Sequence, residues 1–152
     1  MASTNCNPQV AIVYASVTGN THALAAMLQS IASDRQLHSD LYRVEDFSIE
    51  KLSRYDIVLI GTYTWGSGEV PREMRELYEA FENLGHPKVV TAVFGTGDSF
   101  FAEFCGAVDR FRDMLYVHTD LAATLKVELT PQEKDYVRGQ RFVEAVIKRN
   151  KG

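Results

Sequence analysis

Buried-strand patterns alternate with helical patterns along the chain, and this alternation restricts the fold more than any other feature of the sequence. The expected strands cover residues 9–15, 37–43, 55–62, 88–95 and part of 116–129. The expected helices cover residues 21–34, 71–84 and 100–115, and a last helix opens with the capping box Thr130-Pro131-Gln132-Glu133 and closes on Lys148 and Arg149. Five strands alternating with helices predict a doubly wound, five-stranded parallel α/β sheet with helices on both faces.

The length and the absence of linkers indicate how the chain is divided. The chain has 152 residues, which is long enough to bury a core, and it contains no repeat or low-complexity segment. We expect a single domain over residues 1–152, in which residues 1–8 form a loose N-terminal tail.

Composition excludes several classes of protein. Segment 61–113 carries nine acidic and five basic side chains and so accounts for the whole net charge of −4, which argues against nucleic acid as a partner. Solvated glutamates on helix faces would produce the same excess. No apolar run is long enough to span a membrane, and the N-terminus lacks the pattern of a secretory signal. Two cysteines are typical of a reducing cytoplasm, and the scattered histidines predict no metal site.

A strand-to-helix turn at residues 16–21 is the best candidate for an anion site. Its sequence, Ser16-Val17-Thr18-Gly19-Asn20-Thr21, offers three hydroxyls and one amide at a helix N-terminus and contains no Lys or Arg. A nucleotide P-loop would need a Gly-Lys-Ser/Thr sequence, which the chain lacks. Neutral donors at a helix N-terminus favour a terminal phosphate, although an ordinary turn with capping hydroxyls has the same composition.

Two further loops follow expected strands and reach the same carboxyl edge of the sheet. Each combines glycines with large aromatic residues, including Trp65 in the first loop and Phe101 in the second. Considered singly, these residues have ordinary interpretations, because Trp65 can pack under its loop, Phe101 can join the core and Asp98 can cap a helix. Together with the turn at 16–21, the loops indicate a clamp for a flat heterocycle on a phosphorylated tail, which predicts a site for FMN.

These motifs make the chain resemble the short-chain flavodoxins. The resemblance rests on 16–21, on Thr64-Trp65-Gly66, and on 95–98 with Phe104-Cys105-Gly106-Ala107-Val108-Asp109, in the family's order and spacing. It implies the strand order 2-1-3-4-5 and a non-covalently bound FMN. The implied FMN-binding residues are Ser16, Val17, Thr18, Gly19, Asn20, Thr21, Thr62, Tyr63, Thr64, Trp65, Gly66, Gly95, Thr96, Gly97, Asp98, Phe101 and Phe104. The chain differs from many flavodoxins in placing Phe101 where a tyrosine stacks on the flavin, and in its modest net charge.

The resemblance also implies a function without catalytic residues or metal. The chain would be a low-potential one-electron carrier that shuttles between the semiquinone and the hydroquinone, with the Gly66 carbonyl accepting a hydrogen bond from flavin N5. Stacking by Trp65 and Phe101, with the charges of Glu69, Asp98 and Glu103, would disfavour the anionic hydroquinone. The implied partners are a flavodoxin/ferredoxin-type NAD(P)H reductase as donor and redox enzymes as acceptors, and we expect a cytoplasmic monomer.

Other functions are compatible with parts of the sequence. An FMN-dependent quinone or flavin reductase would need a longer active-site insertion than the chain offers. A flavodoxin-like activator of ribonucleotide reductase shares the fold and the cofactor, but the Trp65 loop and Gly95-Thr96-Gly97-Asp98 resemble flavodoxin more closely. A module cut from a larger reductase is a further alternative. A response-regulator receiver domain is excluded, because Gly61-Thr62 stands where that fold needs an aspartate.

Overall fold

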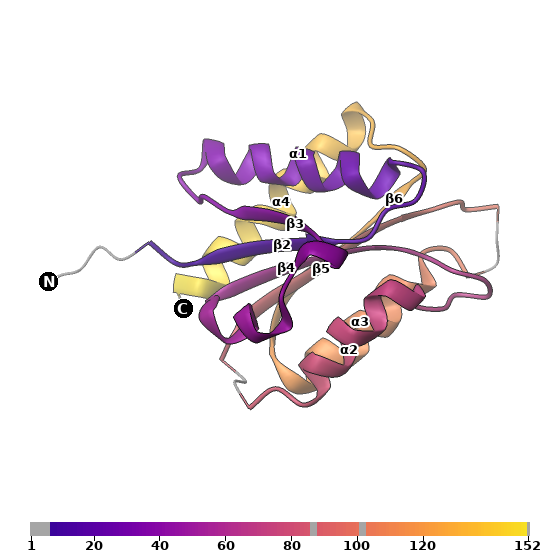
Figure 1. Ribbon diagram of the computed structural model, residues 1–152. Coiled ribbons are helices and arrows are strands. Elements are labelled where there is room, and N and C mark those ends of the chain that lie inside the picture. Colours follow the sequence, from indigo (N-terminus) through magenta and orange to yellow (C-terminus); the bar gives the residue numbers. More distant parts are fainter. Residues whose placement is uncertain (1–6, 86–87, 101–102, 152) are drawn as a thin grey trace, which may run out of the picture.

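A five-stranded parallel sheet forms the centre of the computed structural model, which describes residues 7–85, 88–100 and 103–151. Its strands are β2 (Val10–Tyr14), β3 (Asp40–Arg43), β4 (Ile57–Tyr63), β5 (Val90–Gly97) and β6 (Asp120–Glu128). They lie in the order β3-β2-β4-β5-β6, and every neighbouring pair is parallel (Figure 1). This order confirms the predicted doubly wound α/β fold and its 2-1-3-4-5 arrangement. The predicted loose tail over 1–8 lies mostly outside the described residues.

Two layers of helices cover the sheet (Figure 1). Helices α1 (Asn20–Asp34) and α4 (Glu133–Lys151) pack on one face, while α2 (Arg75–Glu82) and α3 (Gly106–His118) pack on the other. Because successive strand residues point to opposite faces, neighbouring β2 residues enter different cores. Ile12 packs with α1 and α4, whereas Val13 packs with α2 and α3. All five residues of β2 are buried, as a strand covered on both faces requires.

Several element boundaries differ from the predictions. The second strand begins at Asp40, not at residue 37, because the Leu37 N–H still donates to the Ala32 carbonyl of the preceding helix at 2.9 Å and pairing with β2 starts at Asp40, opposite Ala11. Helix α3 begins at Gly106, not at residue 100, because Cys105 before it has a left-handed conformation that a helix cannot contain. The short 3₁₀ helices η1 (Val44–Asp46) and η2 (Ile49–Arg54) were not predicted. The helix predicted over 71–84 begins as the 3₁₀ helix η3 (Arg72–Met74) and continues as α2 from Arg75.

The N-cap of α4 is Gln132, two residues after Thr130, the cap residue of the predicted capping box. The helix begins at Glu133, so Gln132 occupies the capping position. The Asp135 carboxylate accepts a hydrogen bond from the Gln132 N–H at 2.9 Å and forms an ion pair with Arg138 at 2.8 Å. Asp135 therefore does what the sequence assigned to Glu133, and it is buried at 1% exposure while doing so.

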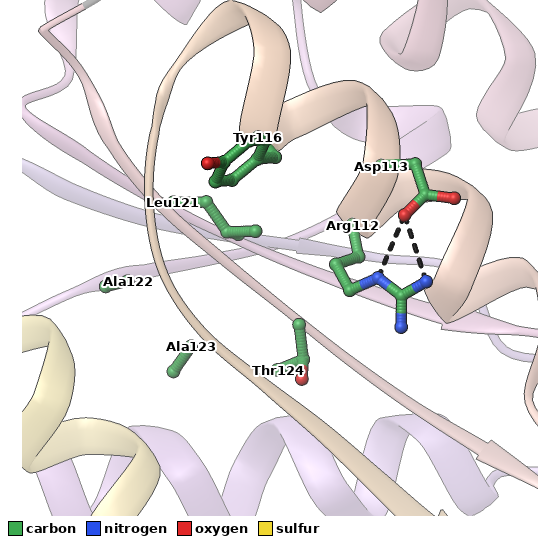
Figure 2. A pocket seen from close by; sticks show the side chains of 7 residues that line it. All are labelled: Arg112, Asp113, Tyr116, Leu121, Ala122, Ala123 and Thr124. Carbon is green, nitrogen blue, oxygen red and sulfur yellow. Dashed lines mark hydrogen bonds and ion pairs between the residues drawn. The ribbon is translucent and has the colours of Figure 1, made fainter.

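Strand β6 forms one edge of the sheet and is partly covered by α4. Arg149 donates to the carbonyl of Leu121 at 3.0 Å, and Arg138 donates to the carbonyl of Lys126 at 2.6 Å. A hollow of about 480 Å³ lies beside the first half of this strand. Figure 2 shows its lining, in which Tyr116 lies near Leu121. The hollow lies toward the amino ends of the strands, away from the predicted site.

Among the described residues, no helix is long and apolar enough to cross a membrane. The same residues contain no group of three or more His, Cys, Asp or Glu side chains that could hold a metal ion.

Candidate functional site

A cavity of about 440 Å³ lies at the carboxyl ends of β2, β4 and β5, where the three predicted loops meet. Parallel α/β sheets bind ligands at this edge, and the volume lies within the range of small-molecule sites. The lining consists of Val17, Thr18, Asn20, Thr21, Tyr63, Thr64, Gly66, Thr96, Gly97, Asp98, Glu103, Cys105 and Leu129. The fold thus brings residues of all three predicted loops into one concave surface.

The hydroxyl of Ser16 stabilises the turn at 16–21. This buried oxygen accepts hydrogen bonds from the N–H groups of Gly19 at 3.1 Å and His22 at 3.3 Å. Gly19, with φ of 95°, then leads into α1. Within the described residues, the N–H groups of Thr18, Asn20 and Thr21 have no hydrogen-bond partner. The turn therefore presents unpaired backbone donors to the cavity at a helix N-terminus, which is the arrangement that an anion needs.

A buried pair of hydroxyls links this turn to β5. The Oγ1 atoms of Thr21 and Thr96 lie 2.7 Å apart, and both residues are at most 3% exposed. A hydroxyl can donate one hydrogen bond while accepting another. Thr21 can therefore donate into the cavity while it accepts from Thr96.

Sequence reasoning missed a cation beside the turn. Arg43, at the end of the edge strand β3, donates to the Ser16 carbonyl at 3.1 Å and lies 5.6 Å from the ring centroid of Tyr14. The turn itself contains no Lys or Arg, but the adjacent strand supplies a positive charge to its first residue. Strand pairing places Arg43 opposite Tyr14, so the strand order was the available signal.

The loop after β4 forms a small hairpin. Trp65 and Glu69 exchange backbone hydrogen bonds of 2.8 and 2.7 Å, and Gly66 at the tip has a φ of 53°. Gly66 and Thr64 line the cavity, whereas Trp65 lies beside it with 59% of its surface exposed. The indole is accordingly available at the rim for the predicted stacking.

The loop after β5 is tied to the end of β6. The Leu129 N–H donates to the Gly97 carbonyl at 2.8 Å, and the Ser99 hydroxyl donates to the Glu128 carboxylate. Asp98 accepts from the Phe100 N–H at 2.9 Å, which is a local turn contact and not the predicted helix cap. Phe101, the predicted stacking residue, lies outside the described residues.

Three other predicted residues are not part of the cavity lining: Thr62 and Gly95 are buried, and Phe104 is half-buried. Thr62 and Gly95 are partners in the β4–β5 pairing. A Cβ at Gly95 would lie 2.4 Å from Val108 Cγ2 and 2.5 Å from the Thr62 carbonyl oxygen, so packing alone requires glycine there. Phe104 is partly buried against the core cluster that lies between the sheet, α2 and α3.

Sequence reasoning also left three lining residues out of the predicted site, namely Glu103, Cys105 and Leu129. Leu129 follows β6, and the carboxyl end of every parallel strand reaches this edge of the sheet, so its position was accessible to the same argument. Cys105 enters the lining because its left-handed conformation, with a φ of 52°, turns the chain beside Gly97. No local sequence pattern marks a non-glycine residue for that conformation.

Burial raises the pKa values of two titratable groups of the lining, both of which are already neutral at physiological pH. Burial and a hydrogen bond to the Glu73 carboxylate raise the pKa of Tyr63 to about 12. Burial also raises the pKa of the Cys105 thiol to about 11. The fixed charges of the cavity wall are therefore the carboxylates of Asp98 and Glu103.

The described residues fit the FMN that the resemblance implies. One end of the cavity presents unpaired N–H groups and hydroxyls suited to a phosphate, without a cation in the turn. The other end is formed by glycine-containing loops with an exposed indole at the rim, which suits a flat ring system.

Comparisons with known proteins agree with this geometry. Residues 12–131 match the flavodoxin family. The chain is 36% identical over 135 residues to probable flavodoxin 1 of Bacillus subtilis strain 168, which covers 86% of this chain and 84% of that relative. The flavodoxin of Streptococcus pneumoniae TIGR4 superposes with a TM-score of 0.85 at 34% identity, covering 93% of this chain and 99% of that chain. Oxidised flavodoxin 2 from Bacillus cereus gives a TM-score of 0.83 at 32% identity, with the same coverage. The chain belongs to the flavodoxin family, whose members bind FMN and carry electrons between proteins without being enzymes.

Proposed function

We propose that this protein is a low-potential one-electron carrier that holds FMN non-covalently and works between the semiquinone and hydroquinone states. The observation that carries the proposal is the polarity of the cavity. Neutral donors of the 16–21 turn lie at one end of the cavity. The carboxylates of Asp98 and Glu103 lie in the wall that is formed by the loop after β5. FMN supplies the one-electron chemistry when it is bound.

The chain's own residues have separate tasks in this proposal. Thr18, Asn20 and Thr21 bind the phosphate through N–H and hydroxyl groups, and the nearby Arg43 adds a favourable charge. The Gly66 carbonyl accepts the hydrogen bond from flavin N5, a role assigned by resemblance. The backbone of Gly66 has a left-handed conformation, which glycine adopts at low cost, so glycine suits this position.

Acidic side chains surround the end of the cavity that would hold the flavin ring, and their charge affects the reduction potential. Asp98 and Glu103 line the cavity, and the Glu69 carboxylate lies beside Gly66, where an added Cβ would be 3.2 Å from its Oε1 atom. Additional negative charge near carboxylates is disfavoured. We therefore expect these residues to lower the potential of the second one-electron step.

The proposal includes a monomeric carrier in the cytoplasm. A flavodoxin/ferredoxin-type NAD(P)H reductase would reduce it, and redox enzymes would accept its electrons. The rim of the cavity offers an apolar contact surface, because Trp65 is 59% exposed and Phe100 is 88% exposed. Acidic residues next to these aromatics favour a partner with a basic docking face.

Anaerobic dithionite titration of the FMN-loaded protein tests the proposal. Two separate one-electron steps with a blue neutral semiquinone are expected, and a single two-electron step would contradict it. The purified protein alone should not sustain oxidation of NAD(P)H with a quinone as acceptor. Sustained turnover in that assay would instead identify the quinone or flavin reductase alternative.

A further inference from the structure

We propose that Arg110 positions the loop that carries Trp65 by holding the Gly68 carbonyl against helix α3, an inference that rests on the proposed function. Arg110 is not part of the cavity lining, and its Nε donates to the Gly68 oxygen at 2.7 Å. A guanidinium donor makes this a charge-assisted hydrogen bond, which is stronger than one between neutral groups. The residue therefore acts on the flavin site through the loop and not by contact with the cofactor.

The base of the loop is held at three points. The Trp65–Glu69 backbone pair closes the hairpin, the Ala107 N–H donates to Thr64 Oγ1 at 3.2 Å, and Arg110 holds Gly68. Two of these three points are supplied by α3, which spans Gly106–His118. Helix α3 thus determines where the loop lies relative to the sheet.

The backbone of Gly68 packs directly against the backbone of Gly106 at the start of α3, which restricts its position. A Cβ at Gly106 would be 2.7 Å from the Gly68 Cα atom, so the two backbones are in direct contact. Gly68 is buried although Gly66, Ser67 and Glu69 on either side of it are exposed. Its φ of 87° requires glycine, and glycine has the greatest backbone freedom to lose. The Arg110 hydrogen bond removes that freedom at the point where the loop meets the helix.

Only the tip of the hairpin is left without such a tether. Among the described residues, Gly66 and Ser67 make no backbone hydrogen bond, whereas residues on both sides of them are held. The arrangement combines a tip that is free to turn the Gly66 carbonyl toward the flavin with a fixed base, which keeps the Trp65 ring in place. Loss of the Arg110 contact should therefore disturb the ring-binding end of the cavity and leave the phosphate end unchanged.

The test compares Arg110→Gln with Arg112→Gln. Both changes remove one positive charge from α3, but Arg112 pairs with Asp109 and Asp113 and has no contact with the loop. Trp65 is the only tryptophan in the chain, so its fluorescence reports on this loop alone. In the cofactor-free protein, Arg110→Gln should lower the fluorescence anisotropy and raise acrylamide quenching, Arg110→Lys should restore part of the difference, and Arg112→Gln should match the wild type.

Ligand binding gives the second measurement. Arg110→Gln should weaken FMN and riboflavin by the same factor, about three- to tenfold, because it affects the ring end that the two ligands share. Unchanged Trp65 anisotropy would overturn the positioning role whether or not the protein binds FMN. A loosened Trp65 with unchanged riboflavin affinity would overturn the link to the flavin. Failure of the wild type to bind FMN would contradict the proposed function, while the fluorescence comparison would still decide whether Arg110 holds the loop.

Discussion

Replacing Thr21 by valine should separate recognition of the phosphate from recognition of the flavin ring. The Thr21 hydroxyl lines the cavity and lies 2.7 Å from the Thr96 hydroxyl, so it can accept from Thr96 while it donates to a phosphate. A hydrogen bond to a charged acceptor contributes about 1.5–3 kcal/mol. Thr21→Val should therefore weaken FMN by about 10- to 100-fold, while riboflavin, which lacks the phosphate, should lose almost nothing.

The same change has a separate effect on the protein without cofactor. Valine leaves the buried Thr96 hydroxyl without its partner, which should reduce the free energy of unfolding by about 1–3 kcal/mol. The double variant with Thr96→Val removes both polar groups and should recover much of this loss, because no hydroxyl is then left unpaired. It should not recover the affinity for FMN.

A second buried threonine pair provides the control. Thr91 and Thr119 also have their hydroxyl oxygens 2.7 Å apart, but Thr91 lies at the amino end of β5, away from the cavity. Thr119 keeps its hydrogen bond to the Leu115 carbonyl at 2.7 Å, so Thr91→Val should cost stability at the low end of that range. Calorimetric titration of each variant with FMN and riboflavin, together with urea unfolding, measures all of these effects. Equal losses of the two ligands in Thr21→Val would show that the phosphate binds elsewhere.

Three further perturbations test other parts of the structure. Gly61→Ala would place a Cβ 2.4 Å from ring atoms of Phe94 in the central sheet, so urea unfolding should show a loss of about 1–3 kcal/mol, and unchanged stability would contradict this packing. Burial raises the pKa of the Cys105 thiol from 9.0 to about 11, so in a C6S variant the S–H Raman band of the folded protein should disappear only toward pH 11, and its loss near pH 9 would refute the shift. Because the unfolded thiol ionises first, the same pKa difference should make stability fall as the pH rises from 9 through 11. Glu69→Gln combined with Glu103→Gln should slow association with a basic reductase at low salt in stopped-flow experiments, and a wild-type rate independent of ionic strength would place the docking face elsewhere.

The elements whose signals are local in sequence were predictable. The apolar runs of β4 and β5, and the change from strand to helix around Gly19, depend on neighbouring residues and on burial on both faces of the sheet. From these, the parallel order places the loops of the cavity at one edge. The position of the cavity therefore followed from the sequence pattern and the general behaviour of parallel sheets.

Features that depend on contacts between distant segments were not predictable in this way. Thr21 pairs with a residue 75 positions along the chain, and Arg43 reaches a turn 27 positions before it. The start of α3 depends on the left-handed conformation of Cys105, and this residue is buried against Gly97. Its side chain has no intrinsic preference for that conformation, so tertiary packing decides the boundary.

The arginines that α4 places over β6 affect how this protein behaves at high concentration. An uncovered edge strand can pair with the same strand of another copy, and a long ladder of this kind leads to aggregation. Arg149 and Arg138 occupy the carbonyls of Leu121 and Lys126, so the longest stretch of β6 without such a contact is residues 122–125. Ladders of that length are too short to be stable in water. Both guanidinium groups are also paired with carboxylates, Arg149 with Asp120 and Arg138 with Asp135, which holds them in place over the edge of the strand.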